Sequence, residues 1–163
     1  MKYRKMGSLD WEVSALGFGC MRFLTKKLDG NDVVDEENAI KMIRYAIDNG
    51  VNYFDTAFPY HSEMSEIIVG KALQEGYREK IKLVTKLPMG RVTKTEDFDK
   101  FLNIQLKKLQ TDHVDIYLFH GLNRQSFELV KRLDLIKKME EAKANGKIKG
   151  IGFSFHDSFE VFK

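Results

Sequence analysis

The sequence has little cysteine, proline or tryptophan, and it lacks a long apolar run. Its 163 residues include a single cysteine, Cys20, and an internal disulfide is therefore excluded. The four histidines are too scattered for a metal-binding spacing, so we expect no metal site. No segment approaches the roughly 20 apolar residues of a membrane-spanning helix. Residues 1–7 lack the apolar core of a signal peptide, and we therefore expect a cytoplasmic protein without a membrane partner.

An excess of charge of one sign is also missing. The chain carries 27 basic and 24 acidic residues, spread along its length, for a formal net charge of +3. This balance gives no indication of nucleic acid as a partner. With 43% apolar and 31% charged residues, the composition is that of an ordinary soluble globular protein. Residues 1–163 are enough for a single domain with its own core.

What the sequence does contain is a regular alternation of strand-like and helix-like segments. Short apolar segments predict strands at 16–21, 51–55, 81–86, 114–119 and 148–153. Helical periodicity predicts helices at 35–49, 62–75, 95–109 and 126–145, with another beginning at 157. Residues 3–6 and 12–14 predict a short hairpin before the first of these strands. Because strands that alternate with helices pair in parallel, the fold class is predicted to be α/β.

Polar residues and glycines mark the expected ends of the helices. Ser62 and Glu63 are expected to open the second helix, and Thr95 is expected to cap the third. Gly76 and Gly146 follow the second and fourth helices, where glycine commonly ends a helix.

The number of strand-helix units decides between two architectures. A closed barrel of eight units needs about 250 residues, whereas this pattern supplies about four units, a fifth strand and an amino-terminal hairpin. We expect a partial (β/α)8 barrel that cannot close alone. An open sheet with helices on both faces is the alternative, but it requires a switch in winding direction that the sequence does not reveal. Open edges at the first and fifth strands expose backbone groups, so we expect a homo-oligomer that pairs these edges.

Four ionisable or phenolic side chains follow apolar segments, where buried strands give way to polar sequence. Asp55, Lys86 and His120 end or follow three of the expected strands, and Tyr60 lies in the loop after the first of the three. Barrel enzymes present their catalytic groups at the carboxyl ends of the strands. The spacing therefore predicts that these four side chains meet at one rim of the sheet.

Each of the four residues also has an ordinary structural interpretation. A strand-end aspartate such as Asp55 is commonly a cap, and Tyr60 could pack its ring on a neighbouring helix. Lys86 could be a solvated surface lysine, and His120 a hydrogen-bonded structural histidine. These interpretations apply to each residue singly, whereas one shared rim for all four favours a site.

The sequence resembles the amino-terminal half of an aldo-keto reductase, over essentially its whole length. The resemblance rests on the segments 13–22 (VSALGFGCMR), 50–57 (GVNYFDTA) and 60–63 (YHSE), on Lys86, and on 115–120 (DIYLFH). It implies a (β/α)8 barrel that uses NADPH to reduce aldehydes or ketones, with Asp55, Tyr60, Lys86 and His120 as the catalytic tetrad. Residues 118–122 (LFHGL) are also similar to a branch whose barrel precedes a ferredoxin-like iron-sulfur domain, although no cysteine cluster is present.

The chemistry implied by the resemblance gives each tetrad residue a role. Reduction of a carbonyl group leaves negative charge on oxygen, so the site must supply a proton and stabilise that charge. Tyr60 is the expected acid, because a neighbouring ammonium on Lys86 favours the phenolate that remains. Asp55 would hold the ammonium, and His120 would donate a hydrogen bond to the substrate oxygen.

The resemblance also implies contacts to the cofactor from Met21, Arg22, Asp55 and Ser154. In the family a serine at the end of the fifth strand is followed by asparagine, whereas this chain has Ser154-Phe155-His156, which puts the Ser154 contact in question. Most cofactor contacts in the family come from later strands, so we expect a small carbonyl substrate and NADPH for the parent enzyme but little or no activity from this chain alone.

Two other classes of function stay open at this point. The chain could be a nucleotide-binding regulatory module of the same fold, because some members keep the tetrad and act chiefly as binding partners. It could also be a structural or interaction module that binds no nucleotide. Steady oxidation of NADPH, or its absence despite binding, separates these classes.

Overall fold

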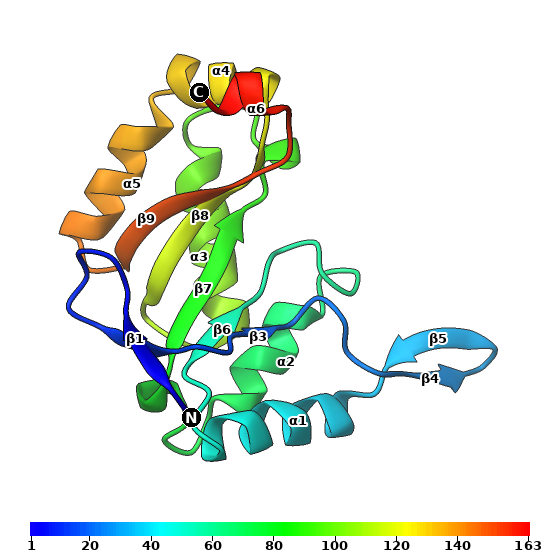
Figure 1. Ribbon diagram of the computed structural model, residues 1–163. Helices are drawn as coiled ribbons and strands as arrows, with labels where there is room; N and C mark the ends of the chain where they lie inside the picture. Colours follow the sequence, from blue (N-terminus) through cyan, green and yellow to red (C-terminus); the bar gives the residue numbers. More distant parts are fainter.

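A twisted parallel sheet forms the centre of the computed structural model, which describes residues 1–163 (Figure 1). Its strand order is β3-β6-β7-β8-β9, so neighbouring strands follow one another along the chain. The strands are β3 (Phe18–Gly19), β6 (Tyr53–Asp55), β7 (Lys82–Leu87), β8 (Val114–Leu122) and β9 (Ile148–Phe155). Every neighbouring pair is parallel, and the order contains no reversal of winding. The α/β class and the partial barrel are therefore confirmed, and the doubly wound alternative is excluded.

The helices follow the strands as the periodicity predicts. They are α1 (Glu36–Asp48), α2 (Ser65–Ala72), α3 (Asp97–Leu109), α4 (Arg124–Arg132), α5 (Leu135–Ala144) and α6 (Phe159–Phe162), with short 3₁₀ helices η1 (Arg78–Lys80) and η2 (Met89–Arg91). In α1 the buried side chains Ala39, Ile43 and Ile47 recur every four residues, and Asp35 caps the amino end by accepting from the Asn38 amide. One face of the helix thus packs on the core while its other face is hydrated. None of the helices combines the length and apolar character needed to cross a bilayer.

Two antiparallel hairpins lie outside the central sheet. The predicted hairpin at the amino terminus is present as β1 (Tyr3–Lys5) and β2 (Glu12–Ser14). The second, β4 (Thr25–Leu28) and β5 (Asn31–Val34), projects from the body of the molecule (Figure 1). The strands expected from the sequence did not include this hairpin. Asp29 and Gly30 connect these strands with φ of 49° and 80°, and Asp-Gly is a sequence typical of such two-residue turns.

The start of the second helix was predicted three residues too early. His61, Ser62 and Glu63 have φ of 52°, 51° and 72°, so they lie in the left-handed region and cannot belong to a right-handed helix. The helix α2 begins at Ser65 instead.

The predicted cap of the third helix and the predicted length of the fourth are also wrong. Thr95 donates its hydroxyl to the Leu133 carbonyl, and Asp97 Oδ2 accepts from the backbone amides of Thr93 and Lys94 instead. The expected helix 126–145 is two helices, α4 and α5, because Asp134 between them has a φ of 52°. Periodicity continues across this break, and it therefore does not reveal a single residue in the left-handed region.

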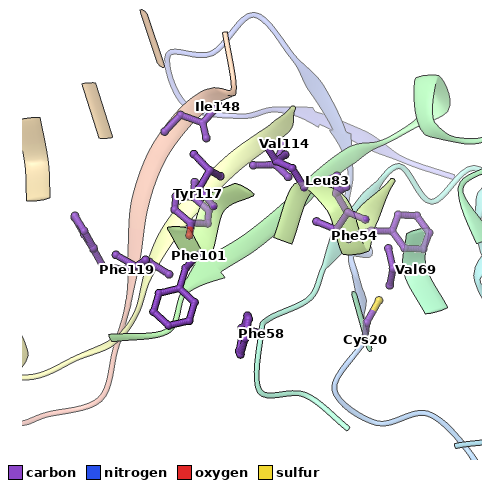
Figure 2. Packing of buried hydrophobic residues seen from close by; sticks show 14 of the residues in the cluster. Cys20, Phe54, Phe58, Val69, Leu83, Phe101, Val114, Tyr117, Phe119 and Ile148 are labelled. Atoms are coloured by element: carbon purple, nitrogen blue, oxygen red, sulfur yellow. The ribbon is translucent and has the colours of Figure 1, made fainter. Parts of the chain in front are cut away.

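The core lies between the sheet and the helices that cover it. Phe54, Leu83 and Tyr117 come from three neighbouring strands and are fully buried (Figure 2). The helices α2 and α3 approach each other closely at Gly70, where an added Cβ would lie 2.4 Å from the Lys108 carbonyl oxygen. Only glycine fits at this crossing.

A buried carboxylate holds the amino end of the sheet together. Asp115 Oδ2 accepts from the Leu83 amide at 2.9 Å and from the Arg78 guanidinium at 2.8 Å, so the carboxylate joins β8 to β7 and to η1. Lys82 and Lys149 lie within 3.8 Å and 3.4 Å of its other oxygen. Burial alone raises the pKa of Asp115, but the Leu83 amide and the Arg78 and Lys149 cations outweigh it and hold the pKa below its usual value.

Candidate active site

The carboxyl end of the sheet carries three of the four side chains that the sequence singled out. Asp55 ends β6, Lys86 lies near the end of β7, and His120 lies on β8. Since these strands are parallel neighbours, their carboxyl ends lie at the same edge. The strand β8 runs on to Leu122, beyond the predicted end at 119, with an irregular register between Phe119 and Leu122.

The ammonium group of Lys86 is the centre of the site. Its Nζ lies 2.6 Å from Asp55 Oδ1 and 2.8 Å from the Thr56 carbonyl oxygen, and it donates to the Tyr60 hydroxyl at 3.2 Å. An ammonium has three hydrogens to donate, and these three acceptors match that number. The Lys86 side chain is 6% exposed and that of Asp55 is 30% exposed. The structure therefore holds a buried cation between a fixed carboxylate and a phenol.

This arrangement sets the direction of the Tyr60 hydroxyl. Because its oxygen accepts from Lys86, its own hydrogen is free to be donated to another molecule. The ammonium also lies 4.8 Å from the centroid of the Tyr60 ring. The Lys86 ammonium thus positions the Tyr60 phenol, and the hydroxyl hydrogen remains available for donation.

His120 also packs against Tyr60. The two rings meet edge to face, with centroids 5.8 Å apart and an interplanar angle of 84°. Burial lowers the pKa of His120, and the positive charge of Lys86 lowers it further. The imidazole is therefore neutral at neutral pH, and a neutral imidazole carries one N–H to donate.

The loop that carries Tyr60 is fixed by contacts that the sequence interpretation missed. His61 Nε2 accepts from the Phe23 amide at 2.9 Å, and its ring stacks on Phe23. Ser65 at the start of α2 donates to the Cys20 carbonyl at 2.9 Å. The sequence interpretation weighed His61 only as a metal ligand, although its place directly after Tyr60 could have indicated a positioning role.

A buried polar network lies behind Lys86, and no motif in the sequence indicated it. Gln105 Nε2 donates to Glu66 Oε1 at 2.6 Å and to the Lys86 carbonyl oxygen at 3.0 Å. Thr85 also donates to Glu66 Oε1, and Tyr117 donates its hydroxyl to Gln105 Oε1. Through these bonds α2, α3 and β8 hold the backbone of β7 at the residue that carries the ammonium.

Glu66 carries the least satisfied oxygen of this network. Its side chain is fully buried, and Oε2 has no hydrogen-bond partner. Burial raises the pKa of Glu66, against the lowering effect of the bonds from Thr85 and Gln105. A buried carboxyl group of this kind favours the protonated state.

The residues expected to contact a cofactor lie around the same edge. Met21 and Arg22 follow β3 directly and are exposed, with the Met21 side chain 46% exposed. On β9, Ser154 Oγ accepts from the Gly121 amide at 2.7 Å, which leaves its own hydrogen free to donate. These groups fit the polar parts of a dinucleotide, because a guanidinium can bind phosphate and a hydroxyl can donate to a carboxamide.

Two further observations concern Cys20 and metals. Cys20 is fully buried beside the site, and burial raises the pKa of its thiol, with the charge of Asp55 adding to the effect. No three His, Cys, Asp or Glu side chains are grouped so that they could hold a metal ion.

The chain is similar to proteins of one family. Residues 15–163 match the family model described as the Aldo/keto reductase family. Probable aldo-keto reductase 1 of Glycine max is 35% identical over 158 residues, which cover 92% of this chain and 44% of that relative.

Solved structures give the same result. The holo form of aldo-keto reductase AKR11C1 from Bacillus halodurans is 33% identical, with a TM-score of 0.78 over 95% of this chain and 50% of its own. An aldo-keto reductase of Klebsiella pneumoniae in complex with NADPH is 27% identical, with a TM-score of 0.75 over 92% of this chain and 48% of its own. The chain thus spans about half the length of the relatives that it matches.

Proposed function

Because the chain belongs to the aldo/keto reductase family, we propose that its site serves the NADPH-dependent reduction of aldehydes or ketones. One observation carries the proposal: the Lys86 ammonium contacts both Asp55 and the Tyr60 hydroxyl at the carboxyl end of the sheet. A reduction of this kind needs a proton donor whose conjugate base is stabilised where it forms. Tyr60 beside a buried cation meets that need.

In the proposed reaction Tyr60 donates its hydroxyl proton to the carbonyl oxygen of the substrate. The phenolate that remains lies 3.2 Å from the Lys86 ammonium, and Asp55 holds that ammonium in place. A positioned acid of this kind contributes about 10²–10⁴ to the rate. We assign Tyr60 as the catalytic acid and Lys86 and Asp55 as the groups that stabilise its conjugate base.

His120 acts on the same oxygen in this proposal. Its neutral imidazole, packed edge to face on Tyr60, can donate an N–H to the substrate carbonyl without adding a second positive charge. The donated hydrogen bond orients the carbonyl and stabilises the charge that develops on oxygen.

NADPH would supply the hydride when bound. Support comes from the Klebsiella pneumoniae relative, whose structure is a complex with NADPH, and from the groups that this chain offers at the same edge. We propose that Arg22 binds a phosphate, that Ser154 donates to the carboxamide, and that Met21 and Asp55 line the remaining wall.

We further propose that this chain alone turns over little or no NADPH, and that a second copy can pair with the open sheet. The strands β3 and β9 each pair on one side only. On β9, Ile151 and Phe153 are 40% and 51% exposed, an unusual exposure for side chains of a central sheet. Sedimentation that finds a monomer at all concentrations would contradict the pairing. The cytoplasmic location expected from the sequence stays a prediction.

The substitution Tyr60→Phe tests the proposed chemistry. It removes the donated proton but keeps the ring, so we expect turnover of NADPH with a small aldehyde to fall about 10²–10⁴-fold while NADPH binding is unchanged. The assay is NADPH oxidation by the chain and by any longer form that includes it, with cofactor fluorescence as the binding measurement. The matched control is Tyr45→Phe, which removes the hydroxyl of a tyrosine that is 71% exposed on α1. Full turnover by Tyr60→Phe would refute the proposal, and binding without turnover in every form would favour a regulatory module.

A further inference from the structure

A cavity of about 960 Å³ opens beside His120, and neither Lys86 nor Tyr60 is among its lining residues. Its walls are Met89 and Gly90 of η2, the segment His120–Gly121 of β8, and one side of α4. The volume is in the range of sites that bind small molecules. The proposed function uses only the end of this cavity at His120, so the rest is available to the part of a substrate that does not react.

The wall formed by α4 is mainly one face of that helix. Six of its residues line the cavity, and all of them except Ser126 lie along one side: Arg124, Gln125, Ser126, Glu128, Leu129 and Arg132. From Arg124 to Arg132 the helix rises about 12 Å. The cavity therefore extends from the reacting end of the site along a helical face, rather than being a round pocket.

This face carries two arginines that form no ion pair within the chain. The arginines that form ion pairs are Arg44, Arg78 and Arg91, and neither arginine of the α4 face is among them. The one carboxylate in the cavity wall, Glu128, pairs with Lys131 at 2.6 Å. Two arginines thus line the cavity without a carboxylate in an ion pair. The Asp157 carboxylate accepts from the Arg124 amide at 3.0 Å, and this bond, together with the charge of Arg124, helps to lower the pKa of Asp157.

Few of the residues that line this cavity are hydrophobic. Of its 11 lining residues only two are hydrophobic, Met89 and Leu129. Sites that bind apolar ligands are lined predominantly by hydrophobic and aromatic side chains. A guanidinium, by contrast, matches a carboxylate or phosphate in shape and charge and can bind it through two parallel hydrogen bonds.

We propose that the α4 face selects carbonyl substrates that carry a negatively charged group, a carboxylate or a phosphate. The carbonyl lies at Tyr60 and His120, and the anionic end lies along α4 at Arg124 or Arg132. The inference rests on the proposed function for the reacting end, while the anion-binding face stands on the cavity and its two arginines.

A matched pair of probes tests the proposal without requiring turnover. Benzaldehyde and 4-carboxybenzaldehyde have the same ring and carbonyl group and differ only in the carboxylate. We expect the carboxylated probe to bind the chain about tenfold more tightly, since a hydrogen bond to a charged group contributes on this scale. Binding is followed by NMR of labelled protein, with shifts expected for the His120 ring and for the guanidinium groups of both arginines.

Substitutions on α4 identify the side chains that bind the carboxylate of the probe. Arg124→Gln and Arg132→Gln together should remove the preference for the carboxylated probe and leave the affinity for benzaldehyde unchanged. The control Lys137→Gln removes one positive charge from an exposed position on α5 outside the cavity and should keep the preference. A preference that survives both arginine substitutions, or equal binding of the two probes to the unchanged chain, would overturn the inference.

A third comparison separates this inference from the proposed reaction. In Tyr60→Phe the preference for the carboxylated probe should persist, because the anion does not contact Tyr60. If the preference persists but no form of the protein turns over NADPH, the reductase proposal fails and the anion-binding face stands. If turnover is found without any preference for the carboxylated probe, the reductase proposal stands and the anion-binding face fails.

Discussion

The two ends of the sheet each contain a buried ion pair, but the buried partner differs. At the amino end the carboxylate is buried, since Asp115 is 1% exposed and Arg78 is 13% exposed. At the carboxyl end the cation is buried, since Lys86 is 6% exposed and Asp55 is 30% exposed. The oxygens of Asp115 are occupied by an amide and by three cations of the chain. The Lys86 ammonium instead directs one of its bonds at a phenol that can still donate.

The difference shows why a buried ion pair alone does not identify a site. Both carboxylate oxygens of Asp115 have partners within the chain. The carboxylate therefore connects neighbouring strands, and it has no free acceptor for a ligand. At the other end Tyr60 retains a free hydrogen, His120 retains a free N–H, and a cavity begins beside them. Chemistry is expected where the bonding is incomplete.

The largest effect on stability should come from breaking the pair at the amino end. Asp115→Ala leaves Arg78 largely buried without its carboxylate, and we expect a loss of about 3–5 kcal/mol in the free energy of unfolding. Urea unfolding followed by circular dichroism measures it. The control Asp99→Ala removes the carboxylate of a pair with Lys138 in which Asp99 is 50% exposed, and it should cost less than about 1 kcal/mol. Equal losses in the two variants would contradict the comparison.

The Asp115 carboxylate also makes the free energy of unfolding depend on pH in the acid range. The folded state lowers the pKa of Asp115, so its contribution is fully present above the pKa of the unfolded chain, near the ordinary value of about 3.9. That contribution is lost as the pH falls through the lower pKa of the folded state. Asp115→Ala should therefore flatten the decline of stability at acid pH.

An intermediate effect is expected at the network behind Lys86. Glu66→Ala leaves the Thr85 hydroxyl without its acceptor and removes one of the acceptors of the Gln105 amide, and we expect a loss of about 1–3 kcal/mol. Glu66→Gln keeps the acceptor and the shape and should lose much less. Because folding raises the pKa of Glu66, its contribution is present below the ordinary value for glutamate and is lost as the pH rises through the folded-state pKa.

Unfolding of the glutamine variant across the pH range checks this sign. Glu66→Gln does not titrate, so its stability should decline less than that of the unchanged chain as the pH rises. A steeper decline in the glutamine variant would show that Glu66 is ionised in the folded state.

The smallest effect on stability is expected at the proposed catalytic cation. Lys86→Met replaces the ammonium by a side chain of similar length, and Asp55 can be hydrated because it is partly exposed. We expect a loss of about 1 kcal/mol in the free energy of unfolding, because the buried Thr56 carbonyl oxygen loses its donor, while turnover falls together with that of Tyr60→Phe. A loss as large as that of Asp115→Ala would mean that the Lys86 pair is primarily structural.

Much of this molecule follows from the sequence, and the exceptions have physical causes. Alternating apolar and amphipathic segments gave the order of strands and helices, and the strand ends placed Asp55, Lys86 and His120 at one edge. Periodicity missed the residues with positive φ, since a single left-handed residue such as Asp134 ends a helix without changing the apolar pattern.

The network behind the site could not be predicted for a different reason. Glu66, Thr85 and Gln105 come from α2, β7 and α3, and each is an ordinary residue at its own place in the sequence. Only the packing of those elements removes water from them and brings them into contact. The cavity beside Arg124 and Arg132 could not be predicted either. Helical spacing places the two arginines on one side of α4, but the rest of the cavity wall comes from η2 and β8.

The crossing at Gly70 has a consequence for how this protein can vary. A hydrogen atom is the largest group that fits between α2 and the Lys108 carbonyl, so this one position fixes the spacing of two helices. The loop of Tyr60 leads into one of them and the amide of Gln105 projects from the other. A methyl group added at Gly70 would shift Tyr60 relative to Lys86. A substitution that contacts no substrate would therefore change the rate of the reaction.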